Sequence, residues 1–176
     1  MPAPESVGVS EVLRLRAEPL TQAAFAPFGD VIEPAAASRH YPINAGSAER
    51  FHDVMRIDTG TADGHTVLSL VFGQPVTLPA RLRLLERHPL GSQSWLPLDG
   101  QRFLIVVAPA GEQWALADVR VFVSDGRQGV NYARGVWHHP LLSLGETPGC
   151  YVVVDRDGPG DNCEERPLPR VVELVI

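Results

Sequence analysis

The chain has 176 residues, 44% of them hydrophobic, and a formal net charge of −6. This length predicts one domain over residues 1–176, and the hydrophobic content excludes a disordered chain. All 15 basic residues are Arg, so catalysis that depends on a lysine is excluded. The negative charge argues against a nucleic-acid partner.

The sequence contains no signal for secretion and no apolar run long enough for a membrane span. Met1–Glu5 lacks the basic and apolar regions of a signal peptide. The longest apolar run, Phe103–Ala110, is too short to cross a bilayer. Cys150 and Cys163 do not form a disulfide framework. We therefore expect a soluble cytoplasmic protein with no membrane partner.

The first part of the chain predicts a leader followed by one short helix. Residues 1–17 are expected to be flexible or to add an edge strand around residues 12–15. Thr21 is a suitable N-cap for a helix over residues 22–26, which Pro27 ends.

Short β-like runs divided by Gly, Pro, Asp and Asn make up the rest of the chain. Gly and Pro occur 16 times each, above their usual shares of about 7% and 5%. Many short strands with almost no helix predict a sandwich, jelly roll or small barrel. The predicted strands cover residues 67–72, 81–88, 94–98, 102–107, 119–123, 141–144, 150–155 and 171–176.

The predicted strand over residues 81–88 places ionisable groups beside leucines. Because side chains alternate across a strand, it has two faces. The face expected to be buried carries Leu82, Leu84, Glu86 and His88, and the exposed face carries Arg81, Arg83, Leu85 and Arg87. A buried ionised group needs a partner, a hydrogen bond or a metal, and burial is expected to raise the pKa of Glu86. The alternative is that the strand leaves the core at its end and Glu86 meets a neighbouring Arg.

A second group of polar residues lies at residues 126–140. A Gly-rich turn with Asn131 and Tyr132 leads into a strand that holds two consecutive histidines. Alternation places one imidazole inward and the other outward, and we expect His138 to be the inward one. It would complete a site with Glu86, His88 and Gln93, which a turn at Gly91 brings back.

The spacing Glu86-x-His88-x4-Gln93-x6-Gly100 resembles the first cupin motif, with Glu in place of the first His and Gln in place of the Glu. The string from Ala133 to His138 resembles the end of the second motif, with Ala in the Pro place. The resemblance implies an all-β fold. The expected architecture is a cupin-like double-stranded β-helix, a jelly-roll barrel, with a short N-terminal helix.

Longer strings resemble the ureidoglycolate lyase family in the same order from about residue 19 to 165. They include residues 26–32 (APFGDVI), 85–93 (LERHPLGSQ), 128–132 (QGVNY) and 135–141 (GVWHHPL). Family members often have His where this chain has Ala133. The resemblance implies a homodimer and the cleavage of (S)-ureidoglycolate to glyoxylate and urea, a step of allantoin and purine degradation.

The residues above suit this reaction by acid–base catalysis in a barrel pocket. A base takes the carbinol proton, the C–N bond breaks, and an acid protonates the departing urea nitrogen. We predict that Glu86, His88 and His138 move the protons. The residues expected to bind substrate are Asn44, Arg50, His52, Gln93, Asn131 and Tyr132, with Arg134 as an alternative to Arg50 for the carboxylate.

The same cluster is a candidate metal site, formed by Glu86, His88, Gln93 and His138. These donors suit Ni²⁺, Mn²⁺, Fe²⁺ or Zn²⁺, and the resemblance implies Ni²⁺. A metal-free acid–base mechanism is the alternative. Two other functions remain open, both with a small-molecule partner. One is a different cupin enzyme, such as a metal dioxygenase or sugar isomerase, and the other is a non-catalytic cupin that binds a small carboxylate.

Overall fold

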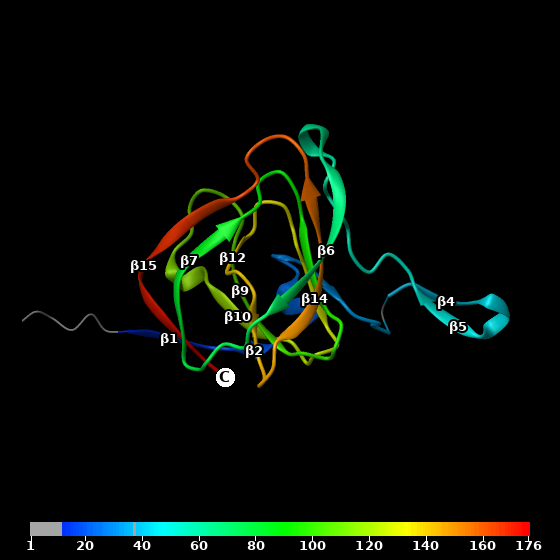
Figure 1. Cartoon of the computed structure of the whole chain (residues 1–176), viewed down its shortest axis with the longest axis horizontal. Coiled ribbons are helices and arrows are strands. Elements are labelled where there is room, and N and C mark those ends of the chain that lie inside the picture. Colours follow the sequence, from blue (N-terminus) through cyan, green and yellow to red (C-terminus); the bar gives the residue numbers. More distant parts are fainter. Residues whose placement is uncertain (1–11, 37) are drawn as a thin grey trace, which may run out of the picture.

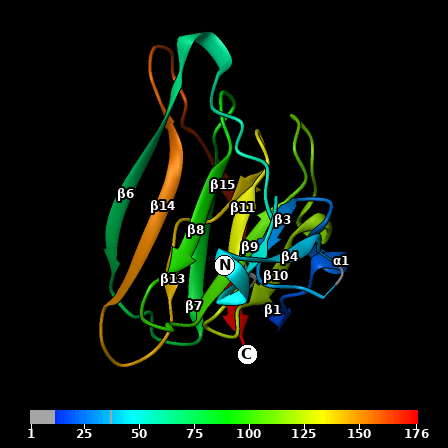
Figure 2. The same ribbon diagram turned by 90° about the vertical axis from the view of Figure 1, so that its right-hand side faces the viewer.

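Two β-sheets form the body of the protein in a computed structural model that describes residues 12–36 and 38–176 (Figures 1 and 2). The larger sheet has the order β1 (Leu13–Arg16), β15 (Glu164–Val175), β7 (Ala80–Arg87), β12 (Trp137–His138), β9 (Phe103–Ala108), β10 (Arg120–Val123) and β2 (Glu18–Pro19), and β13 (Leu142–Ser143) pairs with β9. The second sheet has the order β3 (Gly29–Ile32), β11 (Gly129–Tyr132), β8 (Gln93–Pro97), β14 (Gly149–Asp157) and β6 (His65–Gly73).

The remaining elements are short. A separate hairpin of β4 (His40–Ile43) and β5 (Ala48–Phe51) stands away from the body (Figure 1). The helices are α1 (Gln22–Phe25), η1 (Asn44–Gly46), η2 (Thr61–Asp63) and η3 (Leu116–Asp118). The all-β fold with a short N-terminal helix is therefore confirmed. Among the described residues, no helix is long and apolar enough to span a membrane.

The start of the described chain agrees with the sequence. Thr21 caps α1, because its side chain accepts a hydrogen bond from the Ala24 N–H. Strand β1 forms the expected edge strand and pairs in parallel with β15. The rest of the predicted leader, residues 1–11, lies outside the described residues.

The larger sheet has an apolar core on each of its two faces, and strand β9 contributes to both. Its six residues are all buried, and they alternate between the two cores. Leu104, Val106 and Ala108 pack with residues of β1, β7, β10, β12 and β15. Phe103, Ile105 and Val107 face the second sheet and α1. A strand buried on both faces reads as an unbroken apolar run, as this one does.

Strand β7 departs from the simple alternation expected of it. Arg81 and Arg83 are exposed as predicted, but Leu85 is fully buried and Arg87 is only 9% exposed. The prediction that Leu85 and Arg87 face solvent is therefore wrong. The partner strand β15 shifts register between Pro167 and Val172, opposite the middle of β7. Regular alternation is interrupted there, and Leu85 joins the same core as Leu82.

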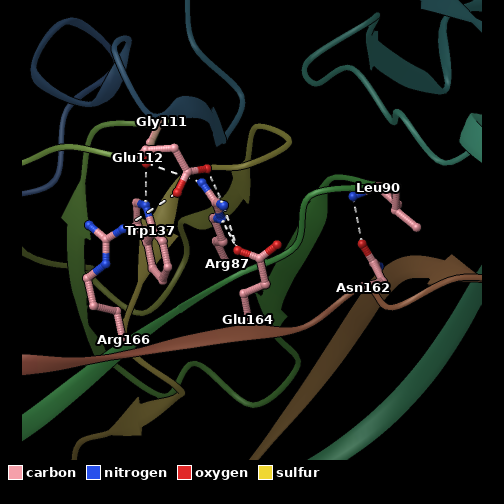
Figure 3. A network of polar contacts seen from close by, with 8 residues as sticks. All are labelled: Arg87, Leu90, Gly111, Glu112, Trp137, Asn162, Glu164 and Arg166. Atoms are coloured by element: carbon pink, nitrogen blue, oxygen red, sulfur yellow. Dashed lines mark hydrogen bonds and ion pairs between the residues drawn. The ribbon is translucent and has the colours of Figure 1, made fainter.

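Arg87 instead organises a polar network around Trp137 (Figure 3). Its guanidinium lies 4.7 Å from the indole ring and donates hydrogen bonds to Glu112 (2.6 Å) and Glu164 (2.8 Å). The Trp137 Nε1–H donates to the carbonyl of Gly111 at 2.8 Å. This network fixes β12 against β7 and β15, and so fixes the residue that follows Trp137, a histidine of the predicted site.

Candidate active site

Glu86 and His138 lie directly opposite each other in the antiparallel pair of β7 and β12. Their side chains therefore share a face, and Glu86 Oε1 is 3.5 Å from His138 Nε2. His88, just past the end of β7, lies with its ring centroid 5.1 Å from that of His138. One ligand atom from each of the three side chains lies within 4.8 Å of the others. The structure brings these three predicted residues together.

A tight turn places His138 in this position. After Tyr132 at the end of β11, the chain turns through Gly135, whose φ of 77° suits glycine. The Gly135 N–H donates to the carbonyl of His88 at 3.0 Å, which ties this turn to the end of β7. Tyr132 then stacks on the His138 ring, with centroids 4.1 Å apart and planes at 14°. The tyrosine holds the plane of the imidazole.

The hydrogen bonds of the two histidines fix which ring nitrogen faces the cluster. His88 Nδ1 lies 2.7 Å from the carbonyl of Asn162, and His138 Nδ1 lies 3.0 Å from the carbonyl of Val136. A carbonyl only accepts, so each Nδ1 carries the proton and each neutral ring keeps a lone pair on Nε2. Both Nε2 atoms are buried without a hydrogen-bond partner. Two lone pairs and a carboxylate therefore converge, an arrangement that requires a shared proton or a cation.

The pKa of Glu86 is shifted in the direction opposite to the one expected from sequence. Burial alone would raise it, but the neighbouring imidazoles of His138, His88 and His139 together outweigh burial, and the pKa lies below its ordinary value. The expectation of a raised pKa is therefore wrong, because it considered the leucines and not the histidines. Glu86 is thus a carboxylate at neutral pH.

The pKa values of His88 and Tyr132 are also shifted. Burial, helped by the nearby His138, lowers the pKa of His88. Burial and the charge of Glu86 raise the pKa of Tyr132, so its phenol keeps its proton. At neutral pH Glu86 is therefore a carboxylate and His88 is a neutral imidazole, and Tyr132 beside the cluster is a protonated phenol.

Gln93 lies opposite Tyr132 in the pairing of β8 with β11. Its Oε1 accepts a hydrogen bond of 2.8 Å from the Trp95 indole, and its side chain also hydrogen-bonds to Asp155. Burial raises the pKa of Asp155, although Gln93 and the nearby His88 partly offset the effect. Gln93 is thus oriented toward the face of the second sheet that carries Tyr132.

Asn131 points to the other face of the second sheet. Its Nδ2 donates to Asp30 and to the carbonyl of Arg56, both at 3.0 Å, and its Oδ1 accepts from Ser94 at 2.8 Å. It lines a cavity of about 560 Å³, together with Arg134 and others. Arg134 is half exposed there, where it donates to Thr61 Oγ1 and lies near Asp58. The structure does not bring Asn131 to the cluster.

The other predicted substrate-binding residues lie on or beside the β4–β5 hairpin. Asn44 is at its turn, Arg50 is in β5 and His52 follows β5. Figures 1 and 2 show this hairpin projecting from the body. Asn44, Arg50 and His52 are therefore not brought to the Glu86, His88 and His138 cluster of the same chain.

Two residues that the sequence left without a role contact the cluster. Asn162 accepts from His88 through its carbonyl, and its Oδ1 accepts from the Leu90 N–H at 2.8 Å (Figure 3). Asp155 hydrogen-bonds to Gln93 and lies near His88. Asn162 is 74 residues from His88 in the chain, and no local pattern links them. For Asp155, its place at the end of an apolar strand was the available signal.

Comparisons with known proteins show which family the chain resembles. The family model described as ureidoglycolate lyase matches residues 12–175. A ureidoglycolate lyase of Burkholderia mallei is 54% identical over 161 residues, covering 92% of this chain and 93% of that protein. One of Pseudomonas aeruginosa is 50% identical over 162 residues, covering 92% and 95%.

A solved structure of RmlC from Streptococcus suis in complex with dTDP-D-xylose matches 54% of this chain and 45% of that one, with a TM-score of 0.41 and 16% identity. The family match extends over nearly the whole chain and includes every residue of the cluster. The chain belongs to the ureidoglycolate lyase family.

Proposed function

We propose that the protein cleaves (S)-ureidoglycolate to glyoxylate and urea by acid–base catalysis. The observation that carries the proposal is the convergence of Glu86, His88 and His138 in a member of this family. The reaction is a retro-addition that needs a base, an acid and a binding site for a carboxylate. The cluster supplies the base and the acid without lysine or thiol.

In the proposed mechanism the cluster moves two protons. Glu86 is a carboxylate beside a neutral His88, so either can accept the proton from the carbinol hydroxyl. As the O–H electrons form the aldehyde of glyoxylate, the C–N bond breaks and its electrons go to the urea nitrogen. The proton taken from the hydroxyl passes to the lone pair on His138 Nε2, which lies 3.5 Å from Glu86 Oε1, and His138 then gives it to that nitrogen. The proton balance closes within the cluster.

Neighbouring side chains are proposed to hold the substrate. Gln93 and the protonated phenol of Tyr132 present hydrogen-bonding groups on the face that carries His138. Arg134 stays a candidate for the carboxylate, although its guanidinium lies in the cavity that Asn131 lines, where it donates to Thr61 Oγ1 and lies near Asp58. Asn44, Arg50, His52 and Asn131 stay candidate substrate contacts, although none lies in this cluster within one chain.

The donor set also fits a divalent metal. Two imidazole Nε2 lone pairs and a carboxylate converge, and each imidazole donates its Nδ1–H to a backbone carbonyl, as metal-bound histidines usually do. Glu86, His88 and His138 would hold the ion, with Gln93 as a further predicted ligand. A bound Ni²⁺ would act as a Lewis acid on a substrate oxygen. The metal-free mechanism uses the same residues, and the next experiment tests whether the cluster binds the ion.

Adding Ni²⁺ to chelator-treated protein should give one bound ion per chain. His138→Ala removes one of the three converging donors and should weaken binding about 10–100-fold, the effect usual even for outer-shell changes. Isothermal titration calorimetry measures the binding, and His65→Ala, at an exposed histidine, is the matched control. Equal binding to both variants would show that the cluster does not hold the metal.

The metal-free protein should show a His88 imidazole that titrates below the ordinary value of 6.5. Burial and His138 favour the neutral ring, whereas the Glu86 carboxylate opposes them, so Glu86→Gln should lower the pKa of His88 further. The unfolded chain binds this proton at the ordinary pKa, so stability is lost as the pH falls below 6.5. Histidine side-chain NMR measures the titration. An ordinary or raised value would contradict the geometry of the site.

The test of the proposed function is glyoxylate release from racemic ureidoglycolate, corrected for non-enzymatic decay. Catalysed release that consumes one enantiomer supports the proposal. Absence of catalysis with metal-loaded and metal-free protein would reject it. Tight carboxylate binding without turnover would then favour the non-catalytic alternative, and oxygen consumption would favour a dioxygenase.

We further infer that residues 12–175 act as one domain, because β9 belongs to both cores. We also propose that the protein is a homodimer, as the family resemblance implies, and that it works in the cytoplasm. Two free cysteines fit a reducing compartment. The surface through which two copies would meet is argued next.

A further inference from the structure

The β4–β5 arm, residues 39–52, lacks support from the rest of its chain. Within the described residues its hydrogen bonds are internal, such as His40 Nδ1 to Glu49 at 2.7 Å and the His52 N–H to the Arg39 carbonyl at 2.8 Å. An isolated two-stranded hairpin is marginally stable in water. Tyr41 and Ile43 share one face of the arm and are only partly buried. The arm therefore needs a surface from elsewhere.

Large apolar side chains are exposed in a row along β6, the edge strand of the second sheet. Leu68, Leu70 and Phe72 are 66%, 59% and 70% exposed, and their spacing puts them on one face. Leu98, 59% exposed, lies near them, since its N–H bonds to the carbonyl of Cys150, the register partner of Phe72. A long apolar edge strand of this kind is usually covered.

The neighbouring strand extends this apolar face. Cys150, Val152 and Val154 of β14 pair with Phe72, Leu70 and Leu68, respectively, and each is only partly buried. We name the outward side chains of β6 and β14 listed so far the outer apolar face, and none of them is charged. A charged ligand or membrane surface would find no complementary group there.

The arm rises from the same side of the molecule as the outer apolar face. In Figure 1 it projects to the right, past β6 and β14. Figure 2 looks at that side, with β6, β14, β8 and β11 side by side and the hairpin in front of the sheet. The outer apolar face and the arm thus lie on the same side of the molecule, where a second molecule can reach both.

We propose that a second copy of this chain packs its outer apolar face against this one, and that each copy's arm lies along the body of the other. A two-fold axis presents the same patch on both subunits, so an uncharged apolar face is complementary to itself. The chain carries a net charge of −6, so two copies would repel unless they met at an uncharged face. The partly buried Tyr41 and Ile43 supply apolar contacts for the arm.

This inference deepens the proposed homodimer and is independent of the proposed reaction, because its test measures assembly and not turnover. The double variant Leu70→Asp, Phe72→Asp places four carboxylates at the contact. It should raise the dimer dissociation constant at least about 100-fold, since like charges across an interface cost several kcal/mol. Val12→Asp, at a residue 41% exposed beside the larger sheet, is the matched control. Sedimentation equilibrium measures the change, and circular dichroism checks the fold.

A second measurement uses the unmodified protein and its two free cysteines. Cys150 lies on the outer apolar face, whereas Cys163 is exposed elsewhere. Maleimide labelling of Cys150 should speed up as the protein is diluted, while labelling of Cys163 should not change. Replacing residues 40–51 by a short Gly-Ser linker should also weaken the dimer. A monomeric wild type, a double variant that still dimerises, or Cys150 labelling independent of concentration would overturn the proposal.

Discussion

Glu86→Gln is expected to lower kcat for ureidoglycolate cleavage by about 10²- to 10⁴-fold, the usual contribution of one positioned acid or base. Glutamine keeps the shape of the side chain but can neither accept a proton nor carry the charge. The native carboxylate lies 3.5 Å from His138 Nε2, and its pKa is held low by the surrounding imidazoles despite burial. The amide removes both the proton acceptor and the negative charge that would hold a cation beside the two Nε2 atoms.

The matched control for this change is Glu146→Gln, at an exposed loop position, which should keep the wild-type rate. Thermal unfolding and metal content are measured on all three proteins. If Glu86→Gln loses its activity while retaining its metal and its fold, the loss belongs to proton transfer. If more than a tenth of the wild-type kcat remains, Glu86 has no role in proton transfer, and His88 becomes the only candidate base.

Much of the cluster could be predicted from sequence because two short patterns carry it. Glu86 and His88 are two residues apart near the end of β7, so their side chains share a face of the strand. The register shift of β15 lies opposite the middle of β7 and does not affect them. Alternation also places His138 and His139 on opposite faces, and the structure buries His138, the one expected to face inward, to 1% exposure. The pKa direction could not be predicted, because it depends on imidazoles brought together by the pairing of β7 with β12.

Long-range placement was beyond the reach of local patterns. Asn131 and Tyr132 are adjacent in sequence, yet they face opposite sides of the second sheet, so only Tyr132 reaches His138. Arg50 lies on an arm that projects from the body of the protein, which its local sequence pattern does not indicate. The support that Asn162 gives to His88 crosses 74 residues. Each case depends on tertiary packing and not on local periodicity.

The strands show the same difference between features that local patterns predict and features that long-range pairing decides. Apolar runs such as β9 and β14 were predicted within two residues of their ends. Strand β3 was missed because Gly29 and Asp30 weaken its pattern, and its pairing with β11 is what makes it a strand. Strand β15 begins at Glu164, well before the predicted residue 171. The prediction missed this first part because it contains Pro167, and proline argues against a strand. The structure accommodates Pro167 next to a register shift.

Phe25→Ala should lower the free energy of unfolding by about 3–5 kcal/mol, the usual cost of removing a buried aromatic ring. Phe25 is fully buried, and its ring lies 5.7 Å from Phe122, edge to face, and 5.9 Å from Phe28. It is the residue through which α1 joins the core between the sheets. Because domains of this size are stable by about 5–15 kcal/mol, the variant should retain only part of its stability.

The site should respond as well, because Phe25 also contacts Tyr132, with ring centroids 6.2 Å apart, and Tyr132 stacks on His138. A cavity behind the tyrosine would let the imidazole plane tilt, so kcat should fall while the protein is still folded. Phe25→Leu refills most of the volume and should restore both stability and rate in part. Urea unfolding and kcat are measured together, with Gln22→Ala, exposed on the same helix, expected within about 0.5 kcal/mol of wild type. A Phe25→Ala variant that loses stability but keeps its full kcat would show that Tyr132 does not need this support to hold His138.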